Sequence, residues 1–244
     1  MQNAAFEALG LDWRYVRLPV PPERFEETAR ALPRSGYRGA NVTIPHKLAA
    51  LALADRPTEA AAAIGAANTL TFEDGGIEAD NTDAAAILDS VGEAVRGAHA
   101  LVLGAGGAAR AAAFALREGG AAEVSVWNRT PEREAALAAE LGLRFAERPG
   151  PADLVVNATS VGLDPAPGER EALEALGLAE LDPPEVLVDL PYGSAETAPC
   201  AWASRAGARV VDGVEVLVRQ GARSLERWTG RSAPIESMRR AAEG

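Results

Sequence analysis

The sequence predicts an α/β fold built on a parallel sheet, and two features support that prediction. Short apolar runs typical of strands recur through the middle of the chain, and segments of helical composition separate them. Residues 214–243 then have helical composition, interrupted near Gly230. With 244 residues, 48% of them hydrophobic, the chain can bury one large core or two modest ones.

Each element follows from a local pattern. Helices are expected at residues 3–9, 23–32 and 46–63, the last interrupted at Pro57, and strands at 13–18 and 39–43. A hairpin is expected where Asp74-Gly75-Gly76 joins the segment 66–72 to the segment before Asn81. The later strands are expected at 99–106, 123–129, 153–159, 186–190 and 208–213, with helices at 108–117 and 131–141 and a loop with a short helix at 165–185.

Composition narrows the class of protein. The net charge of −11 and the isoelectric point near 4.8 argue against a nucleic-acid-binding surface, which is normally basic. Cys200 is the only cysteine, so no intrachain disulfide can form, as is usual in a reducing cytosol. No run is apolar and long enough to cross a bilayer, and the first residues lack the pattern of a signal peptide. We therefore expect a cytoplasmic protein without nucleic-acid or membrane partners.

The basic residues are unevenly divided: of 24 lysines and arginines, only Lys47 is a lysine. One interpretation is that the composition of the chain is biased toward arginine and that the single lysine remains by chance. The other is that position 47 needs a group that exchanges a proton, which an amine can do and a guanidinium, locked in its charged form, cannot. We favour the second interpretation.

A glycine-rich turn predicts a dinucleotide site. GAGGAARA (104–111) follows an apolar strand and opens a helix, where main-chain N–H groups can bind a pyrophosphate. Ala109 replaces the third glycine of the usual pattern, which is tolerated, although a plain glycine turn explains the motif equally well. The predicted cofactor contacts of this turn are Gly104, Ala105, Gly106, Gly107 and Ala108.

The end of the next strand bears on which dinucleotide is bound. NAD-binding units usually carry an acid there, whereas this chain has Asn128-Arg129-Thr130, with Arg133 one turn later. A guanidinium can bind a 2′-phosphate through two hydrogen bonds, so the arginines at the end of this strand favour NADP over NAD. For Arg133 alone, a solvated surface arginine is a fair alternative.

Hydride transfer to or from an alcohol also needs a group that exchanges the hydroxyl proton and a partner that holds that group. Lys47 in NVTIPHK (41–47) and Asp83 in DNTD (80–83) are the candidates, with the carboxylate orienting the ammonium. His46, beside a loop proline, is interpreted as structural.

Eight motifs in order resemble those of the shikimate dehydrogenase family, essentially from end to end. They are NVTIPHK, AANT (66–69), DNTD, GAGGAAR, NRT, NATSVGL (157–163), DLPY (189–192) and VLVRQGA (216–222). The resemblance implies reversible reduction of 3-dehydroshikimate to shikimate with NADPH. It implies two domains around a cleft: a substrate domain at 1–84 and 219–244, and a Rossmann-type NADP domain at 85–218. We expect a monomer or a homodimer.

Residue roles follow from the same resemblance. Lys47 and Asp83 match the catalytic pair of the family. The implied substrate contacts are Thr43, Asn68, Tyr192 and Gln220. Besides the glycine turn and the NRT tip, the implied cofactor contacts are Glu59, Thr159, Leu190 and Gly213. No metal site is implied.

Three features depart from the family pattern. Family members begin with a strand and an H-S-x-S-P-like loop whose serines hold the substrate carboxylate, and Met1-Gln2-Asn3 starts inside that pattern. Without that strand a sheet edge or gap must be covered in another way. Ala84 stands where glycine is common, and Val216 where methionine is common. We expect either a start assigned too far downstream or a naturally short chain with lost or altered activity.

Two other functions stay open on these residues. A paralogue acting on quinate or an aminated analogue would share most of the motifs, although the NRT tip disfavours an NAD-dependent quinate enzyme. A non-catalytic NADP-binding protein would explain the absent serines, but it does not explain why the catalytic pair and the other predicted substrate contacts are retained.

Overall fold

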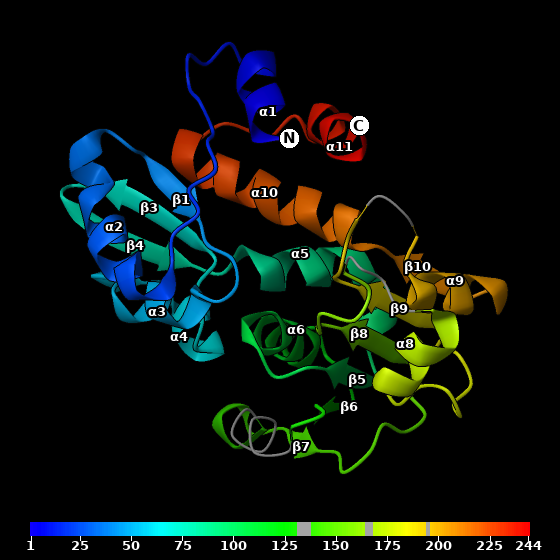
Figure 1. Cartoon of the computed structure of the whole chain (residues 1–244). Coiled ribbons are helices and arrows are strands. Elements are labelled where there is room, and N and C mark those ends of the chain that lie inside the picture. Colours follow the sequence, from blue (N-terminus) through cyan, green and yellow to red (C-terminus); the bar gives the residue numbers. More distant parts are fainter. Residues whose placement is uncertain (131–137, 164–167, 194–195) are drawn as a thin grey trace. The chain divides into compact units, whose positions relative to one another are not determined.

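The computed structural model of the chain describes residues 1–130, 138–163, 168–193 and 196–244 (Figure 1). The chain forms two compact units. The first unit comprises Met1–Ala86 with Leu217–Gly244, and the second comprises Ile87–Val216.

The second unit is built on a six-stranded parallel sheet. Its strands, in spatial order, are β10 (Arg209–Val211), β9 (Val186–Asp189), β8 (Leu154–Asn157), β5 (His99–Leu103), β6 (Glu123–Trp127) and β7 (Arg144–Phe145). The first strand of the unit, β5, lies in the middle, and the chain winds outward from it in both directions, as in dinucleotide-binding folds. The predicted parallel sheet is confirmed, whereas the two-residue strand β7 was not predicted.

Helices of the second unit separate these strands. They are α6 (Gly107–Glu118), α8 (Glu169–Ala175) and α9 (Ala198–Arg205), with a 3₁₀ turn η3 at Gly92–Val95. Helix α6 packs against β5 and β6, and the leucines of the sheet, such as Leu101 and Leu103, are almost completely buried. The helix predicted at 131–141 falls partly on residues 131–137, which lie outside the described residues; residues 138–141 are helical.

The first unit has a mixed four-stranded sheet in the order β1 (Gly39–Asn41), β3 (Thr69–Glu73), β4 (Gly76–Asp80), β2 (Arg56–Pro57). The predicted hairpin is confirmed: β3 and β4 pair antiparallel, with Glu73 opposite Gly76. The two residues of the turn, Asp74 and Gly75, both have positive φ, at 51° and 75°. A two-residue turn that matches the twist of the strands requires this conformation, which aspartate and glycine accept most readily.

Helices cover this sheet and extend to both chain ends. They are α1 (Gln2–Ala8), α2 (Phe25–Ala31), α3 (Lys47–Ala52), α4 (Glu59–Ile64) and α11 (Ile235–Glu243), with 3₁₀ turns η1 (Pro22–Arg24) and η2 (Pro33–Ser35). Two further helices, α5 (Thr82–Val91) and α10 (Gly213–Thr229), begin in one unit and end in the other. The core includes Phe25, Leu70, Phe72 and Ile77. Helices α1 and α11, near the two ends of the chain, pack side by side (Figure 1).

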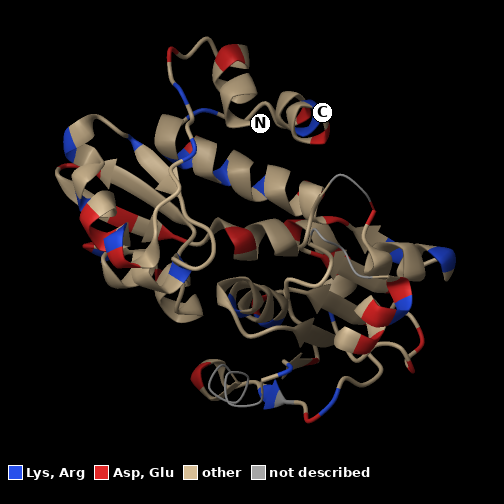
Figure 2. Cartoon of the chain, viewed as in Figure 1, with Lys and Arg blue, Asp and Glu red and all other residues tan. Residues whose placement is uncertain are grey.

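Acidic and basic residues are interspersed along the helices (Figure 2). Pairs one helical turn apart include Arg30 with Glu26 at 3.0 Å and Arg170 with Glu174 at 2.8 Å. Such exposed pairs contribute little to stability. In the described parts of the chain, no helix is apolar over a length that could cross a membrane. The same residues hold no group of three or more His, Cys, Asp and Glu side chains placed to bind a metal ion.

The strand predicted at 13–18 is wrong, because residues 11–20 have no regular secondary structure. The main chain of Tyr15 bonds to a side chain instead: Asn3 Oδ1 accepts from the Tyr15 N–H at 2.7 Å, and Asn3 Nδ2 donates to the Tyr15 carbonyl at 3.0 Å. A β-favouring composition gives a strand only where a neighbouring strand is available to pair with it. Among the described residues this segment has none.

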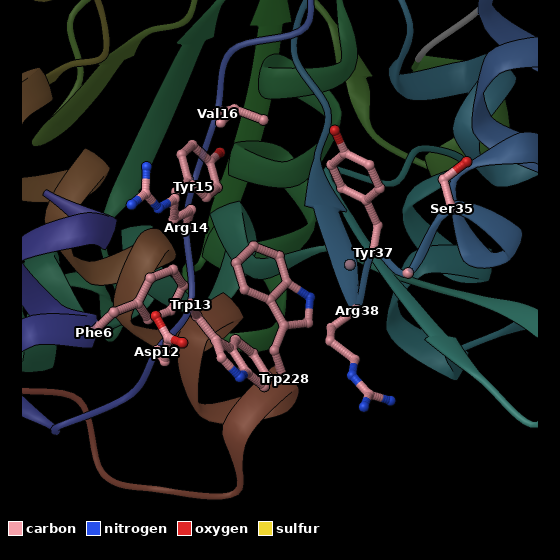
Figure 3. A pocket seen from close by; sticks show the side chains of 12 residues that line it. Phe6, Asp12, Trp13, Arg14, Tyr15, Val16, Ser35, Tyr37, Arg38 and Trp228 are labelled. Atoms are coloured by element: carbon pink, nitrogen blue, oxygen red, sulfur yellow. The ribbon is translucent and has the colours of Figure 1, made fainter.

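A groove lies beside residues 14–20, where a pairing strand would be needed. It has a volume of about 450 Å³ and lies between residues 14–20 and β1. A second pocket of about 380 Å³ adjoins it, and Figure 3 shows Tyr15 and Trp228 on one side with Tyr37 across from them. The Tyr15 hydroxyl donates to Asn41 Oδ1 at 3.0 Å across the groove. The outer edge of β1 thus faces a groove.

Gly39 of β1 gives a test of this packing. A Cβ atom there would lie 2.1 Å from Nε1 of Trp228, which donates to the Leu70 carbonyl, and 2.6 Å from that carbonyl oxygen. We expect Gly39→Ala to lower the free energy of unfolding by about 2 kcal/mol, because the indole must leave its hydrogen bond. Urea unfolding followed by tryptophan fluorescence measures the change.

Gly76→Ala, in the same sheet, is the matched control. Its added methyl group meets chiefly the end of the flexible Arg56 side chain, at 2.8 Å, which can move away. We expect a change within about 0.5 kcal/mol. Equal effects of the two substitutions would show that the Trp228 contact does not set the requirement for glycine.

Candidate active site

The first unit brings the predicted pair together. Lys47 Nζ donates to Asp83 Oδ2 at 2.6 Å, and both side chains are only 12% exposed. Lys47 is the first residue of α3, and Asp83 lies in the first turn of α5. The two residues are 36 positions apart in the chain, so their contact depends on the fold of the whole unit.

The other oxygen of Asp83 is held by a second predicted residue. Asn68 Nδ2 donates to Asp83 Oδ1 at 2.8 Å and approaches Gln220 Oε1 at 3.4 Å. Asn68 Oδ1 accepts three hydrogen bonds, from Thr82 N at 2.8 Å, Thr69 Oγ1 at 3.0 Å and Thr82 Oγ1 at 3.2 Å. These donors fix which end of the amide faces the carboxylate. Lys47, Asp83, Asn68 and Gln220 therefore form one cluster.

Local structure places each member of the cluster. The Asn81 side chain caps α5, because its Oδ1 accepts from the N–H groups of Asp83 at 3.1 Å and Ala84 at 3.3 Å. Its Nδ2 donates to the Ala66 carbonyl at 2.9 Å, which ties the start of α5 to the turn before β3. The Ala67 N–H in turn donates to the Lys47 carbonyl at 2.9 Å. The start of α3, which carries Lys47, and the start of α5, which carries Asp83, are thus both bonded to residues 66–67.

The sequence did not reveal the polar layer behind this cluster. Asn41 Nδ2 donates to Ser224 Oγ at 2.7 Å, and the hydroxyls of Ser224 and Thr69 lie 2.9 Å apart. Thr69 Oγ1 also lies 3.1 Å from Thr82 Oγ1. Three of these residues fall inside NVTIPHK, AANT and DNTD, where polar side chains interrupt apolar context, and that signal could have found them. Ser224, on α10, had no such signal.

Three other residues of the first unit bear on the predicted site. Thr43 is exposed in the loop before α3 and lines the groove beside β1. Glu59 is exposed in the first turn of α4. The His46 ring stacks on Phe25 with centroids 4.5 Å apart, and its Nε2 lies 2.9 Å from the Val20 carbonyl. These contacts support the structural interpretation of His46.

In the second unit, the glycine turn joins β5 to α6. Gly104 has a φ of +117°, and a Cβ atom there would lie 2.9 Å from the Ala158 carbonyl oxygen. The position therefore requires glycine, both for its backbone conformation and for the close approach of the next loop. Gly106 is the N-cap of α6 and has no side chain to bond the first N–H groups, which suits a bound phosphate.

The loops after β5 and β8 flank the point where the strand order reverses, which is where ligands bind in such sheets. Thr159 follows β8 there, and Leu190 follows β9. A Cβ atom on Gly213 would lie 2.5 Å from the Leu190 carbonyl oxygen, so this glycine is also required by close backbone contact. The predicted cofactor residues Gly104, Thr159 and Leu190 thus lie on loops at one edge of the sheet, and Gly213 begins α10 at the same edge.

The tip of β6 adjoins this edge. The Gly104 N–H donates to the Trp127 carbonyl at 2.7 Å, so the glycine turn and residues 128–130 are neighbours. Asn128 Nδ2 donates to the Thr130 carbonyl at 3.1 Å, and Arg129 is exposed. Arg133 lies outside the described residues. The glycine turn, the uncapped helix and the exposed Arg129 together fit an NADP pyrophosphate and 2′-phosphate.

Tyr192 is the one predicted substrate contact in the second unit. It lies in the segment after β9 and is 50% exposed.

Family models match most of the chain. The shikimate dehydrogenase substrate-binding domain matches residues 1–70, the shikimate/quinate 5-dehydrogenase model matches residues 86–160, and the shikimate 5′-dehydrogenase C-terminal domain matches residues 213–243. The fold and these matches define a dehydrogenase with a dinucleotide-binding unit.

Individual proteins identify the family. The chain is 45% identical to a shikimate dehydrogenase (NADP(+)) of Anaeromyxobacter dehalogenans, over 100% of this chain and 90% of the relative. It is 40% identical to that of Methanothermobacter thermautotrophicus, over 98% of this chain and 88% of the relative. The crystal structure of Thermus thermophilus shikimate 5-dehydrogenase with NADP(H) and shikimate is similar, with a TM-score of 0.83, 39% identity, and 99% and 91% of the two chains covered. The chain belongs to the shikimate dehydrogenase family.

Cys200, on α9, gives a test of the second unit. Burial, together with the neighbouring Asp189, raises the pKa of its thiol to about 12. The thiolate fraction at pH 8 is then about a thousandfold below that of an ordinary cysteine. We expect a disulfide reagent such as DTNB to leave the native protein unmodified and to react fully after unfolding in guanidinium. Fast reaction of the native protein would contradict the burial of this side chain.

Proposed function

We propose that this protein is an NADP-dependent shikimate dehydrogenase, which interconverts 3-dehydroshikimate and shikimate. The observation that carries the proposal is the Lys47–Asp83 pair, completed by Asn68 and Gln220. Membership of the family and the NADP-compatible turn of the second unit support it.

Lys47 is the proton-exchanging group in this proposal. Its ammonium donates a proton to the oxygen of the ketone during reduction, and its amine takes the hydroxyl proton back during oxidation. Asp83, bonded to Lys47 at 2.6 Å, holds the amine in place and offsets its charge. Asn68 and Gln220 present amide groups beside the pair, which suits hydrogen bonds to substrate hydroxyls. Thr43 and Tyr192 complete the proposed substrate contacts.

The bound cofactor would supply the hydride as NADPH and accept it as NADP⁺. The residues proposed to hold it are those of the glycine turn (Gly104, Ala105, Gly106, Gly107 and Ala108), those of the β6 tip (Asn128, Arg129, Thr130 and Arg133), and Glu59, Thr159, Leu190 and Gly213. Under this proposal the first unit supplies most of the substrate contacts and the second most of the cofactor contacts, with Tyr192 and Glu59 as the exceptions. We further propose that the protein acts in the cytoplasm, as a monomer or a homodimer.

Replacement of Lys47 tests the proposed chemistry. We expect Lys47→Ala to lower kcat by about 10²- to 10⁴-fold, because the proton transfer loses its positioned group. Lys47→Arg keeps the positive charge but cannot release a proton, so it should be similarly impaired. The measurement is NADPH formation from shikimate and NADP⁺, followed by absorbance.

Arg30→Ala, which removes an exposed cation of α2, is the control and should keep full activity. Parallel assays with quinate and with NAD⁺ separate the alternatives. Faster turnover of quinate would favour the paralogue, and NADP⁺ binding without turnover of either substrate would favour a non-catalytic protein. Undiminished activity of Lys47→Ala would refute the role of Lys47.

Arg129 tests the choice of cofactor. We expect Arg129→Ala to raise the KM for NADP⁺ by about 10- to 100-fold, because a charge-assisted hydrogen bond to the 2′-phosphate is lost. The KM for NAD⁺, which lacks that phosphate, should change little. An equal effect on both cofactors would indicate a general distortion of the turn instead.

A further inference from the structure

The second unit contains a buried carboxylate that the proposed chemistry does not use. Asp189 ends β9, has no exposed surface, and its burial raises its pKa. Asn157 Nδ2 donates to its Oδ1 at 2.6 Å, and Thr197 Oγ1 and Cys200 Sγ donate to its Oδ2, the sulfur at 3.5 Å. In its ionised form this carboxylate only accepts, and the three donors around it match that form.

Asn157, at the end of β8, connects Asp189 to the loop that follows β8. Its Nδ2 also donates to the Val161 carbonyl at 3.1 Å. Its Oδ1 accepts from the N–H of Thr159 at 3.1 Å and from Thr159 Oγ1 at 2.7 Å, and that hydroxyl accepts from the Val161 N–H at 3.0 Å. Because Asp189 can only accept, it fixes which end of the Asn157 amide faces Thr159.

The loop held in this way borders the proposed cofactor site. The Ala158 carbonyl lies against Gly104 of the glycine turn, where a Cβ atom would come within 2.9 Å of it. At its other end, Gly162 has a φ of +109° and lies close to Pro191 and Thr197. A turned Asn157 amide would thus disturb the surface on which the pyrophosphate and nicotinamide ends of a dinucleotide are proposed to lie.

We propose that Asp189 and Asn157 are positioning residues for NADP binding: the carboxylate orients the Asn157 amide, and the amide shapes the loop that carries Thr159. The inference rests on the proposed function, because it assigns the ligand of this loop. Neither side chain touches the reacting atoms in this proposal; both act through Thr159 and the main chain of residues 158–161.

Asn157→Asp is the first test. It places a second carboxylate against Asp189, so the two must share a proton, and they repel each other once the pH rises above the pKa of that proton. We expect NADP⁺ affinity, measured by calorimetry, to fall about tenfold relative to the parent chain at high pH and to approach the parent at low pH. Cys200 and Asp212 are the other titratable groups that act on Asp189, and both are retained.

The exchange variant Asn157→Asp with Asp189→Asn is the second test. It restores one donor facing one acceptor and removes the extra charge, so most of the affinity should return and the added pH dependence should vanish. If Asn157 and Asp189 only filled space, the exchange would neither restore the affinity nor remove a pH dependence. Cys200→Ala, which removes the weakest donor to the same carboxylate, is the matched control and should bind NADP⁺ like the parent chain.

The parent chain separates the two proposals. If it binds no NADP⁺, the proposed function fails; if it binds and Asn157→Asp binds equally at every pH, only the present inference fails. Circular dichroism and thermal unfolding verify that each variant folds. If Asn157→Asp does not fold, Asp189→Asn is the test instead. The introduced amide can accept hydrogen bonds at its oxygen only, whereas both oxygens of Asp189 accept them. We then expect affinity about threefold weaker, and unchanged affinity would overturn the inference.

Discussion

The orientation of the Asn68 amide is the constraint on which the candidate site depends. Three donors surround its oxygen, so its NH₂ group must face Asp83, and Asp83 is then held at both oxygens, by Asn68 and by Lys47. Turning the amide would oppose donor to donor in a buried layer, at a cost of about 1–3 kcal/mol for each group left unpaired. The amine, carboxylate and amide groups of the cluster are therefore held in one arrangement by the fold itself.

The second unit also contains an asparagine whose amide is oriented by its hydrogen-bond partners. Asn157 also stands between a carboxylate and the N–H and hydroxyl groups of a threonine, and its amide is oriented by that carboxylate. The two units otherwise differ in how they build a site. The first unit relies on side-chain hydrogen bonds, whereas the second relies on main-chain contacts that only glycine permits, at Gly104 and Gly213.

Features that depend on local sequence were predictable, and those that depend on distant partners were not. The Asp74-Gly75 turn requires positive φ at two successive residues, and the apolar runs of the parallel strands are legible without knowledge of the fold. The segment 13–18 has the composition of a strand, but pairing is decided by what lies beside it, and a groove lies there instead. Lys47 and Asp83 were paired by resemblance, but their contact is seen only in the fold. Ser224 joins the polar layer from α10, at a position just beyond the motif VLVRQGA (216–222).

The scarcity of lysine has a practical consequence. Because Lys47 is the only lysine, a chain grown on isotope-labelled lysine would carry the label at a single residue, and that residue lies in the candidate site with its side chain only 12% exposed. Its nitrogen resonances would need no assignment by substitution. A nuclear magnetic resonance titration could then follow the amine, its hydrogen bond to Asp83 and the arrival of each ligand in the unaltered protein.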